Sequence, residues 1–293
     1  CDDNSDGSAR NGFSKTIDLE SQTAEILGTQ SSAIYSVTYH RDLNEAQNGL
    51  NPLVSPFSNT TANRQTIYVR VFNADTQCAN GISDFDVIIN PEPTFETISN
   101  LSECDNNDDF DDSNGIIQTI DLDGKIPEIL GASQDPDDFN VTFHASKANA
   151  TSGNSAISSP YENSFATETI FVRIQNKRTG CVNDDAFFDV IVNSLPDFTV
   201  TTPQILCLNN VPLNIKVENP RGVYTYEWKN TNGTTLNTVS ADNINITVEG
   251  IYTVTATTTN GTLCSRTETI VIKESNIATL QSSFITIIDE SNN

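Results

Sequence analysis

The sequence has few basic residues and no long apolar run. Lysine and arginine number 15 against 39 acidic residues among 293, so the formal net charge is −24. This charge argues against nucleic acid and anionic membranes as partners, and it favours solubility and divalent cations. No apolar stretch approaches the roughly 18 residues of a membrane span, so membrane insertion is not expected. No basic and apolar leader precedes Cys1.

Residues that would support catalysis are also scarce. Methionine is absent, tryptophan occurs once, and His40 and His144 are the two histidines. No serine lies in a G-x-S-x-G motif. Carboxylates that recur on strands favour salt bridges or metal contacts over the paired acids of glycoside hydrolysis. The sequence therefore predicts a protein that is not an enzyme.

The sequence does contain an internal repeat of about a hundred residues. The segment that begins at Cys1 aligns without a gap on the one that begins at Cys104, and the match continues through "TIYVRVFN" and "TIFVRIQN" to "FDVIIN" and "FDVIVN". Such a period indicates an array of modules, and a chain that starts inside a repeat indicates a piece of a longer protein. The expected modules are 1–93, which lacks its first strand, 94–196, a divergent module at 197–275, and the start of another at 276–293.

Apolar and polar residues alternate in most of the conserved segments. "YSVTYH", "TIYVRVFN" and "GIYTVTAT" are rich in β-branched and aromatic residues and are separated by Asn, Asp, Gly and Pro. Helix is limited to one or two turns at 24–28 and 42–49. We expect an all-β fold of tandem immunoglobulin-like β-sandwich modules. The linkers "NPEP" and "NSLP" are short and stiffened by proline, which predicts an elongated rod.

The third module resembles a bacterial immunoglobulin-like domain. It carries a cysteine, then "YTYEWKN", then "VEGIYTVTAT" and a second cysteine. In that resemblance Trp228 is a core residue on the third strand. Tyr252 is the corner tyrosine, whose hydroxyl binds the backbone of a nearby loop. Both residues are expected to be structural.

Six cysteines occur as two in each module. The positions are Cys1, Cys78, Cys104, Cys181, Cys207 and Cys264. They allow 15 pairings, and the repeat favours pairing within each module, as 1–78, 104–181 and 207–264. Disulfides would place the protein in an oxidising compartment. The alternative is a set of buried free thiols.

The start of each repeat has the alternating oxygen ligands of half a calcium loop. The predicted ligands are Asp2, Asn4 and Asp6 in the first repeat and Asp105, Asn107 and Asp109 in the second. Gly7 follows the first set, whereas Phe110 stands at its place in the second. Neither set has a glutamate at the twelfth position, so these are not EF-hands. The alternative is a solvated, Asx-rich turn.

The repeats resemble those of very large Bacteroidota surface proteins. The resemblance rests on "CDD", "EILG", "VTYH", "SPF", "TIYVRVFN" and "FDVIIN", followed by a module ending "KESNIA". It is to gliding-motility adhesins exported by the type IX secretion system. It implies an extracellular stalk at the cell surface that spaces an adhesive region from the cell and bears load. Its partners would be neighbouring modules and the secretion and gliding machinery.

A second function class is a glycan-binding accessory module of a secreted polysaccharide-degrading enzyme. Such modules usually expose aromatic residues to a sugar. The single tryptophan stands where a core residue is expected, and this favours the stalk over a partnership with surface glycans.

Overall fold

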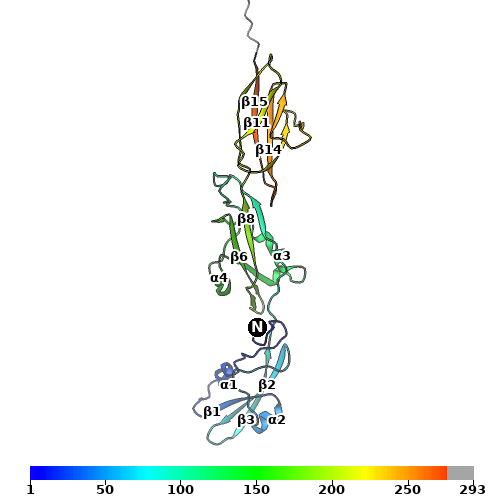
Figure 1. Cartoon of the computed structure of the whole chain (residues 1–293). Helices are drawn as coiled ribbons and strands as arrows, with labels where there is room; N and C mark the ends of the chain where they lie inside the picture. The colour runs from blue at the N-terminus through cyan, green and yellow to red at the C-terminus, as the bar shows by residue number, and fades with distance from the viewer. Residues whose placement is uncertain (276–293) are drawn as a thin grey trace, which may run out of the picture. The chain divides into compact units, whose positions relative to one another are not determined.

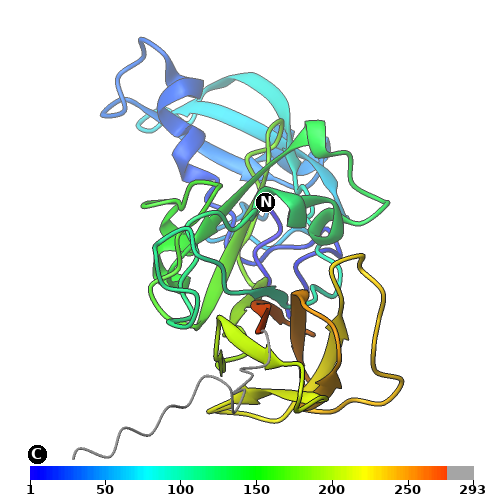
Figure 2. The same ribbon diagram turned by 90° about the horizontal axis from the view of Figure 1, so that it is seen from above.

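The computed structural model describes residues 1–275, so the further module predicted at 276–293 lies outside the described residues. Contacts within the chain define two compact units. Unit 1 comprises Cys1–Ser99, Asp121–Ser158 and Thr169–Phe188, and unit 2 comprises Asn100–Ile120, Ser159–Glu168 and the chain from Asp189 on. The second repeat therefore contributes residues to both units. Strands dominate each unit (Figures 1 and 2), so the all-β prediction is confirmed.

The first repeat forms one antiparallel sheet and three short helices within unit 1. Its elements are η1 (Glu20–Gln22), α1 (Thr23–Leu27), β1 (Tyr35–His40), α2 (Leu43–Asn48), β2 (Arg64–Asn73) and β3 (Ala79–Ile88). The sheet order is β1-β2-β3. The period-two pattern of β2 places Ile67 and Val69 in the core with Leu19, Tyr39 and Phe57. Both predicted helical turns form, as α1 and α2.

The second repeat has the same elements and additional strands. They are β4 (Leu101–Cys104), η2 (Asp123–Lys125), α3 (Ile126–Leu130), η3 (Pro136–Asp138), β5 (Phe139–His144), α4 (Lys147–Ser152), β6 (Thr167–Asn176), β7 (Val182–Asn183) and β8 (Phe187–Asn193). The sheet order is β4-β8-β6-β5, and β7 pairs with β6. The strand β4 is parallel to β8, with Leu101 opposite Val190. The first repeat has no counterpart of β4 among its described strands.

The third module is a two-layered sandwich within unit 2. Its strands are β9 (Thr199–Val200), β10 (Gln204–Cys207), β11 (Leu213–Glu218), β12 (Tyr224–Lys229), β13 (Asn243–Ile246), β14 (Gly250–Thr258) and β15 (Ser265–Ser275). One sheet has the order β10-β15-β14-β12 and the other β13-β11-β9. Side chains from both sheets, among them Ile215 and Val254, meet in one core. That arrangement is the expected β-sandwich.

Trp228 and Tyr252 lie in this core. Trp228 is 0% exposed, and its ring N–H donates to the carbonyl of Ala241 at 2.8 Å. The Tyr252 hydroxyl donates to the carbonyl of Val248, four residues upstream, also at 2.8 Å. This is the tie that a corner tyrosine makes. A buried tryptophan cannot stack on a sugar, so this module offers no tryptophan platform for a glycan.

Candidate functional site

Two disulfide bonds connect successive modules. Cys1 bonds to Cys181, with 5.4 Å between their Cα atoms, and both residues lie in unit 1. Cys104 bonds to Cys264, with 5.5 Å between their Cα atoms, and both lie in unit 2. Cys78 and Cys207 are free and exposed. The predicted pairing within modules, as 1–78, 104–181 and 207–264, is therefore wrong.

The length of a strand explains why a module cannot close on itself. In the first repeat, Asp2 follows Cys1 and donates its backbone N–H to the carbonyl of Asn90 at 2.7 Å, just beyond the end of β3. Cys78 stands just before the other end of β3, a strand of ten residues. At about 3.3 Å per residue such a strand is roughly 30 Å long, whereas bonded cysteines have Cα atoms less than 7 Å apart. Cys1 and Cys78 are thus at opposite ends of their module.

The same small junction occurs at both disulfides. The carbonyl oxygen of Asn90 lies 3.8 Å from the sulfur of Cys181. At the second junction the carbonyl of Asn193 accepts the N–H of Asp105 at 2.8 Å and lies 3.8 Å from the sulfur of Cys264. The first cysteine of one module therefore meets the second cysteine of the next. The two asparagines end the matching motifs "FDVIIN" and "FDVIVN", but nothing in their sequence identifies the cysteine that each contacts.

A buried aspartate follows the first cysteine at each junction. Asp2 is 1% exposed, and its Oδ2 accepts the N–H of Gly12 at 2.9 Å. Asp105 is 3% exposed and accepts the N–H of Gly115 at 2.7 Å. Gly12 has φ +78°, and a Cβ there would lie 2.5 Å from the backbone nitrogen of Asn63. Only glycine suits such a position, so each aspartate holds a tight loop beside the disulfide.

The family now follows from a comparison with known proteins. The family model of the Flavobacterium inter-domain disulphide bond domain matches residues 1–93 and 100–196. The chain belongs to this family. The bonds Cys1–Cys181 and Cys104–Cys264, which join successive modules, fit the family's description. A search of the curated proteins gives no match.

Solved structures that match the inter-domain disulphide bond chain share little sequence with it. Three N-terminal domains of the Hoc capsid protein of bacteriophage RB49 are 9% identical, with a TM-score of 0.31; 83% of this chain and 89% of that chain are covered. Sidekick-1 immunoglobulin domains 1–4 are 12% identical, with a TM-score of 0.24 and coverages of 83% and 66%. The glucan-utilisation protein SGBP-B of Bacteroides ovatus is 12% identical, with a TM-score of 0.19 and coverages of 83% and 61%. The chain thus spans just under two thirds of the Sidekick-1 and SGBP-B chains.

The predicted calcium ligands of the inter-domain disulphide bond repeats are bound by the loop itself. Asp6 accepts the N–H of Ser8 at 3.1 Å and the side-chain amide of Asn11 at 2.7 Å. Asp109 accepts from the backbone of Asp111 at 3.0 Å and from the amide of Asn114 at 2.6 Å. Asn4 has φ +55°, and the carbonyl of Asn107 accepts the N–H of Phe110 at 3.3 Å.

Within residues 1–275, no three side chains of His, Cys, Asp and Glu gather as a metal centre. The Oδ1 atoms of Asp2 and Asp108 are buried without a hydrogen-bond partner in the described chain. Calcium binding stays a prediction.

The loops set carboxylate pKa values in both directions. Burial raises the pKa of Asp105, and the neighbouring Asp109 adds to that rise, although N–H groups of Gly115 and Asn106 oppose it. Burial also acts to raise the pKa of Asp3, but hydrogen bonds from Ser5 and other neighbours outweigh it and lower this pKa to about 2. The loops therefore stabilise their exposed carboxylates through local donors.

The histidines occupy equivalent buried positions. The Nδ1 of His40 lies 2.7 Å from the carbonyl of Leu50, and its Nε2 lies 2.9 Å from the Thr38 hydroxyl. His144 has the same two kinds of neighbour at 3.0 and 2.9 Å. Both ring nitrogens are thus engaged in each histidine. Neither imidazole is presented to a substrate, and none of the helices in residues 1–275 is long and apolar enough to span a membrane.

Proposed function

We propose that this chain is part of the stalk of a flavobacterial cell-surface adhesin. The stalk spaces an adhesive region from the cell and bears load during attachment or gliding. The observation that carries this proposal is the pair of disulfides Cys1–Cys181 and Cys104–Cys264, each of which crosses from one module to the next. Such a bond keeps two modules attached even when both unfold, because the connection no longer depends on folded contacts.

Chemistry and resemblance supply the location. Disulfides persist in oxidising environments, which supports an extracellular protein. The repeats resemble those of gliding-motility adhesins, and this supports export by the type IX system and partnership with the gliding machinery. The net charge of −24 keeps such an array soluble.

The test compares adhesion with and without tension. A flavobacterium that makes the full-length protein would carry either Cys104→Ser together with Cys264→Ser, or Ser32→Ala at an exposed position. Immunolabelling of intact cells checks that each variant reaches the surface. We expect the double variant to attach normally in still medium and to detach at lower shear than the Ser32→Ala control. Equal resistance to shear contradicts the mechanical role, and absence of label from intact cells contradicts the location.

A further inference from the structure

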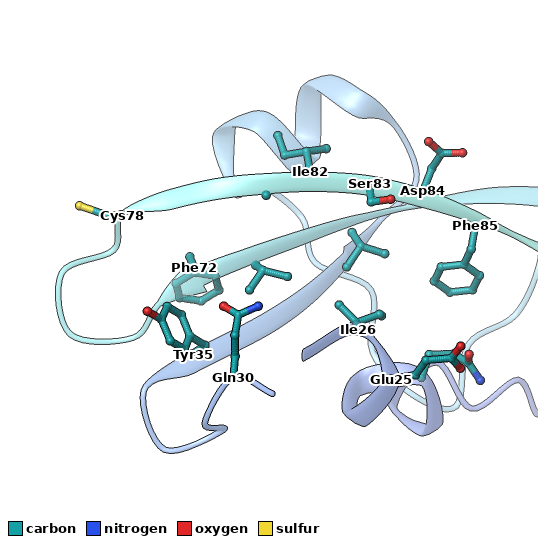
Figure 3. Close-up of a pocket in the computed structure, with 14 residues that line it drawn as sticks. Glu25, Ile26, Gln30, Tyr35, Phe72, Cys78, Ile82, Ser83, Asp84 and Phe85 are labelled. Atoms are coloured by element: carbon teal, nitrogen blue, oxygen red, sulfur yellow. The ribbon is translucent and has the colours of Figure 1, made fainter. Parts of the chain in front are cut away.

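A groove of about 600 Å³ opens beside the sheet of the first repeat, entirely within unit 1. Ile26 on α1 and Phe85 on β3 point into it from opposite sides (Figure 3), and Val69 and Val71 on β2 complete its apolar lining. Among the described strands β3 pairs only with β2, so its outer edge is open. An open strand edge beside an apolar groove is a template for an added strand.

The equivalent positions of the second repeat are closed. The matched pairs are Ile26 with Ile129, Val71 with Ile174, and Phe85 with Phe188. The residues of the second repeat are 0%, 0% and 2% exposed, whereas their counterparts in the first repeat are only half-buried. The side chains are of the same kind, so the difference lies in what covers them.

The cover of the second repeat is residues 94–104, which we name the leading segment. Its first half is bonded along α3 and the following turn. The N–H of Glu96 donates to the carbonyl of Ile129 at 3.0 Å, and the N–H of Ser99 donates to the Glu128 carboxylate at 2.5 Å. The backbone of Thr94 exchanges two hydrogen bonds with the side chain of Gln134, at 3.0 and 2.7 Å.

The second half of the leading segment is the strand β4. It lies parallel to β8, with Leu101 opposite Val190 and Cys104 opposite Asn193. The third module adds a strand in the same way, because β10 lies parallel to β15. In both modules the added strand ends at the first cysteine.

The first repeat keeps the groups that would hold such a segment. Glu25 and Gln30 line the groove and are exposed, and they stand where Glu128 and Gln134 stand in the second repeat, the latter pair with a one-residue slip. Within residues 1–275 nothing bonds to either side chain as the leading segment bonds to α3. The polar anchors and the apolar lining are thus both present beside an open strand edge.

We propose that this groove is an acceptor site for an extended strand of the leading-segment type, joined directly ahead of Cys1. The strand pairs in parallel with residues 87–90, the counterparts of 190–193. Its alternate apolar side chains fill the space between α1 and the sheet. The first repeat is therefore completed by a neighbouring module, in the way that the second and third are completed within this chain.

The test adds the missing strand as a defined probe. Ten residues that copy 94–103, TFETISNLSE, are joined ahead of Cys1 of the full chain, which reproduces the register of the second repeat. The control extension has aspartate in place of the copies of Phe95, Ile98 and Leu101. Amide hydrogen exchange is then followed for residues 85–90. We expect at least tenfold slower exchange with the copied strand than with the control extension, because backbone N–H groups at the edge become paired.

Two variants locate the effect. In the extended chain, Ile26→Asn should abolish the protection, whereas Val54→Ser, at an apolar residue that is 75% exposed and lies outside the groove, should not. Thermal unfolding without the extension shows that each variant is folded. Equal exchange with the copied and control extensions overturns the proposal. A dimer of the unextended chain that Ile26→Asn dissociates also overturns it, since the occupant would then be a second copy.

Discussion

At the scale of single residues, the position of a cysteine relative to a strand decides its partner. Cys1 and Cys78 are 77 residues apart, as are Cys104 and Cys181 (78 − 1 and 181 − 104). That equality reflects the repeat and does not report proximity. The number of cysteines and their regular placement were readable from sequence, but the partner was not. The ten residues of β3 hold Cys78 away from Cys1, and only the structure brings the next module to Asn90.

The cysteine pattern predicts which thiols react in the native protein. Cys78 and Cys207 are free and exposed, so we expect two fast-reacting thiols per chain from alkylation without denaturant, and six after reduction and unfolding. Peptide mapping without reduction should recover the pairs 1–181 and 104–264. A peptide that joins Cys1 to Cys78, or a native count of zero or six thiols, would contradict the structure.

A second residue-scale prediction separates the structural role of the acidic loop from calcium binding. Asp2→Ala leaves the buried N–H of Gly12 without its acceptor, so it should lower the free energy of unfolding by about 1–3 kcal/mol with or without calcium. If the loop binds calcium as its sequence predicts, the ion should raise the midpoint of thermal unfolding at matched ionic strength. Asp6→Ala should remove that rise and Ser5→Ala should retain it. A wild-type midpoint that calcium does not move leaves the loop as an acidic turn.

At the scale of elements, local pattern and tertiary contact contributed differently. The alternation of "TIYVRVFN" indicated β2, and Gly28 and Gly49 marked the ends of the two short helices, because these signals are local. The parallel pairing of β4 with β8 was not readable. A four-residue strand such as Leu101–Cys104 carries too little pattern to name a partner some ninety residues away. The side chains that hold the leading segment, Glu128 and Gln134, were missed for the same reason.

The anchoring of the leading segment should weaken in acid. The hydrogen bond from Lys125 and then the N–H of Ser99 lower the pKa of Glu128 from 4.5 to about 2. A lowered carboxyl pKa contributes stability above its unfolded value, and that stability is lost as the pH falls from about 4.5 towards 2. We expect the amide resonance of Ser99 to titrate in this window. Glu128→Gln should make unfolding less dependent on pH there.

The matched control for this titration is Glu25→Gln, at the equivalent position of the first repeat, where no described residue bonds to the carboxylate. This variant should leave the acid dependence of unfolding unchanged. Equal effects of the two variants would show that the Glu128 carboxylate does not anchor the segment through its charge.

At the scale of the whole molecule, the two disulfides form overlapping loops. Cys104 lies inside the loop closed by Cys1 and Cys181, and Cys181 lies inside the loop closed by Cys104 and Cys264. A covalent path can therefore run from Cys1 across the first bond to Cys181, back along the chain to Cys104, and across the second bond to Cys264. It contains 77 residues (181 − 104), whereas the peptide chain from Cys1 to Cys264 contains 263 (264 − 1).

This covalent topology predicts how far the protein extends when it is pulled from its two ends. A stretched chain spans at most about 3.4 Å per residue, so the path between Cys1 and Cys264 should reach about 260 Å with both bonds intact and about 890 Å after reduction. Single-molecule force measurements on the full chain, with and without reductant, report the difference of about 630 Å. Cys104→Ser should lengthen the oxidised path from 77 to 83 residues (264 − 181). An oxidised path of 52 residues, as bonds within modules would leave between Cys78 and Cys104 and between Cys181 and Cys207, would contradict the crossed pairing.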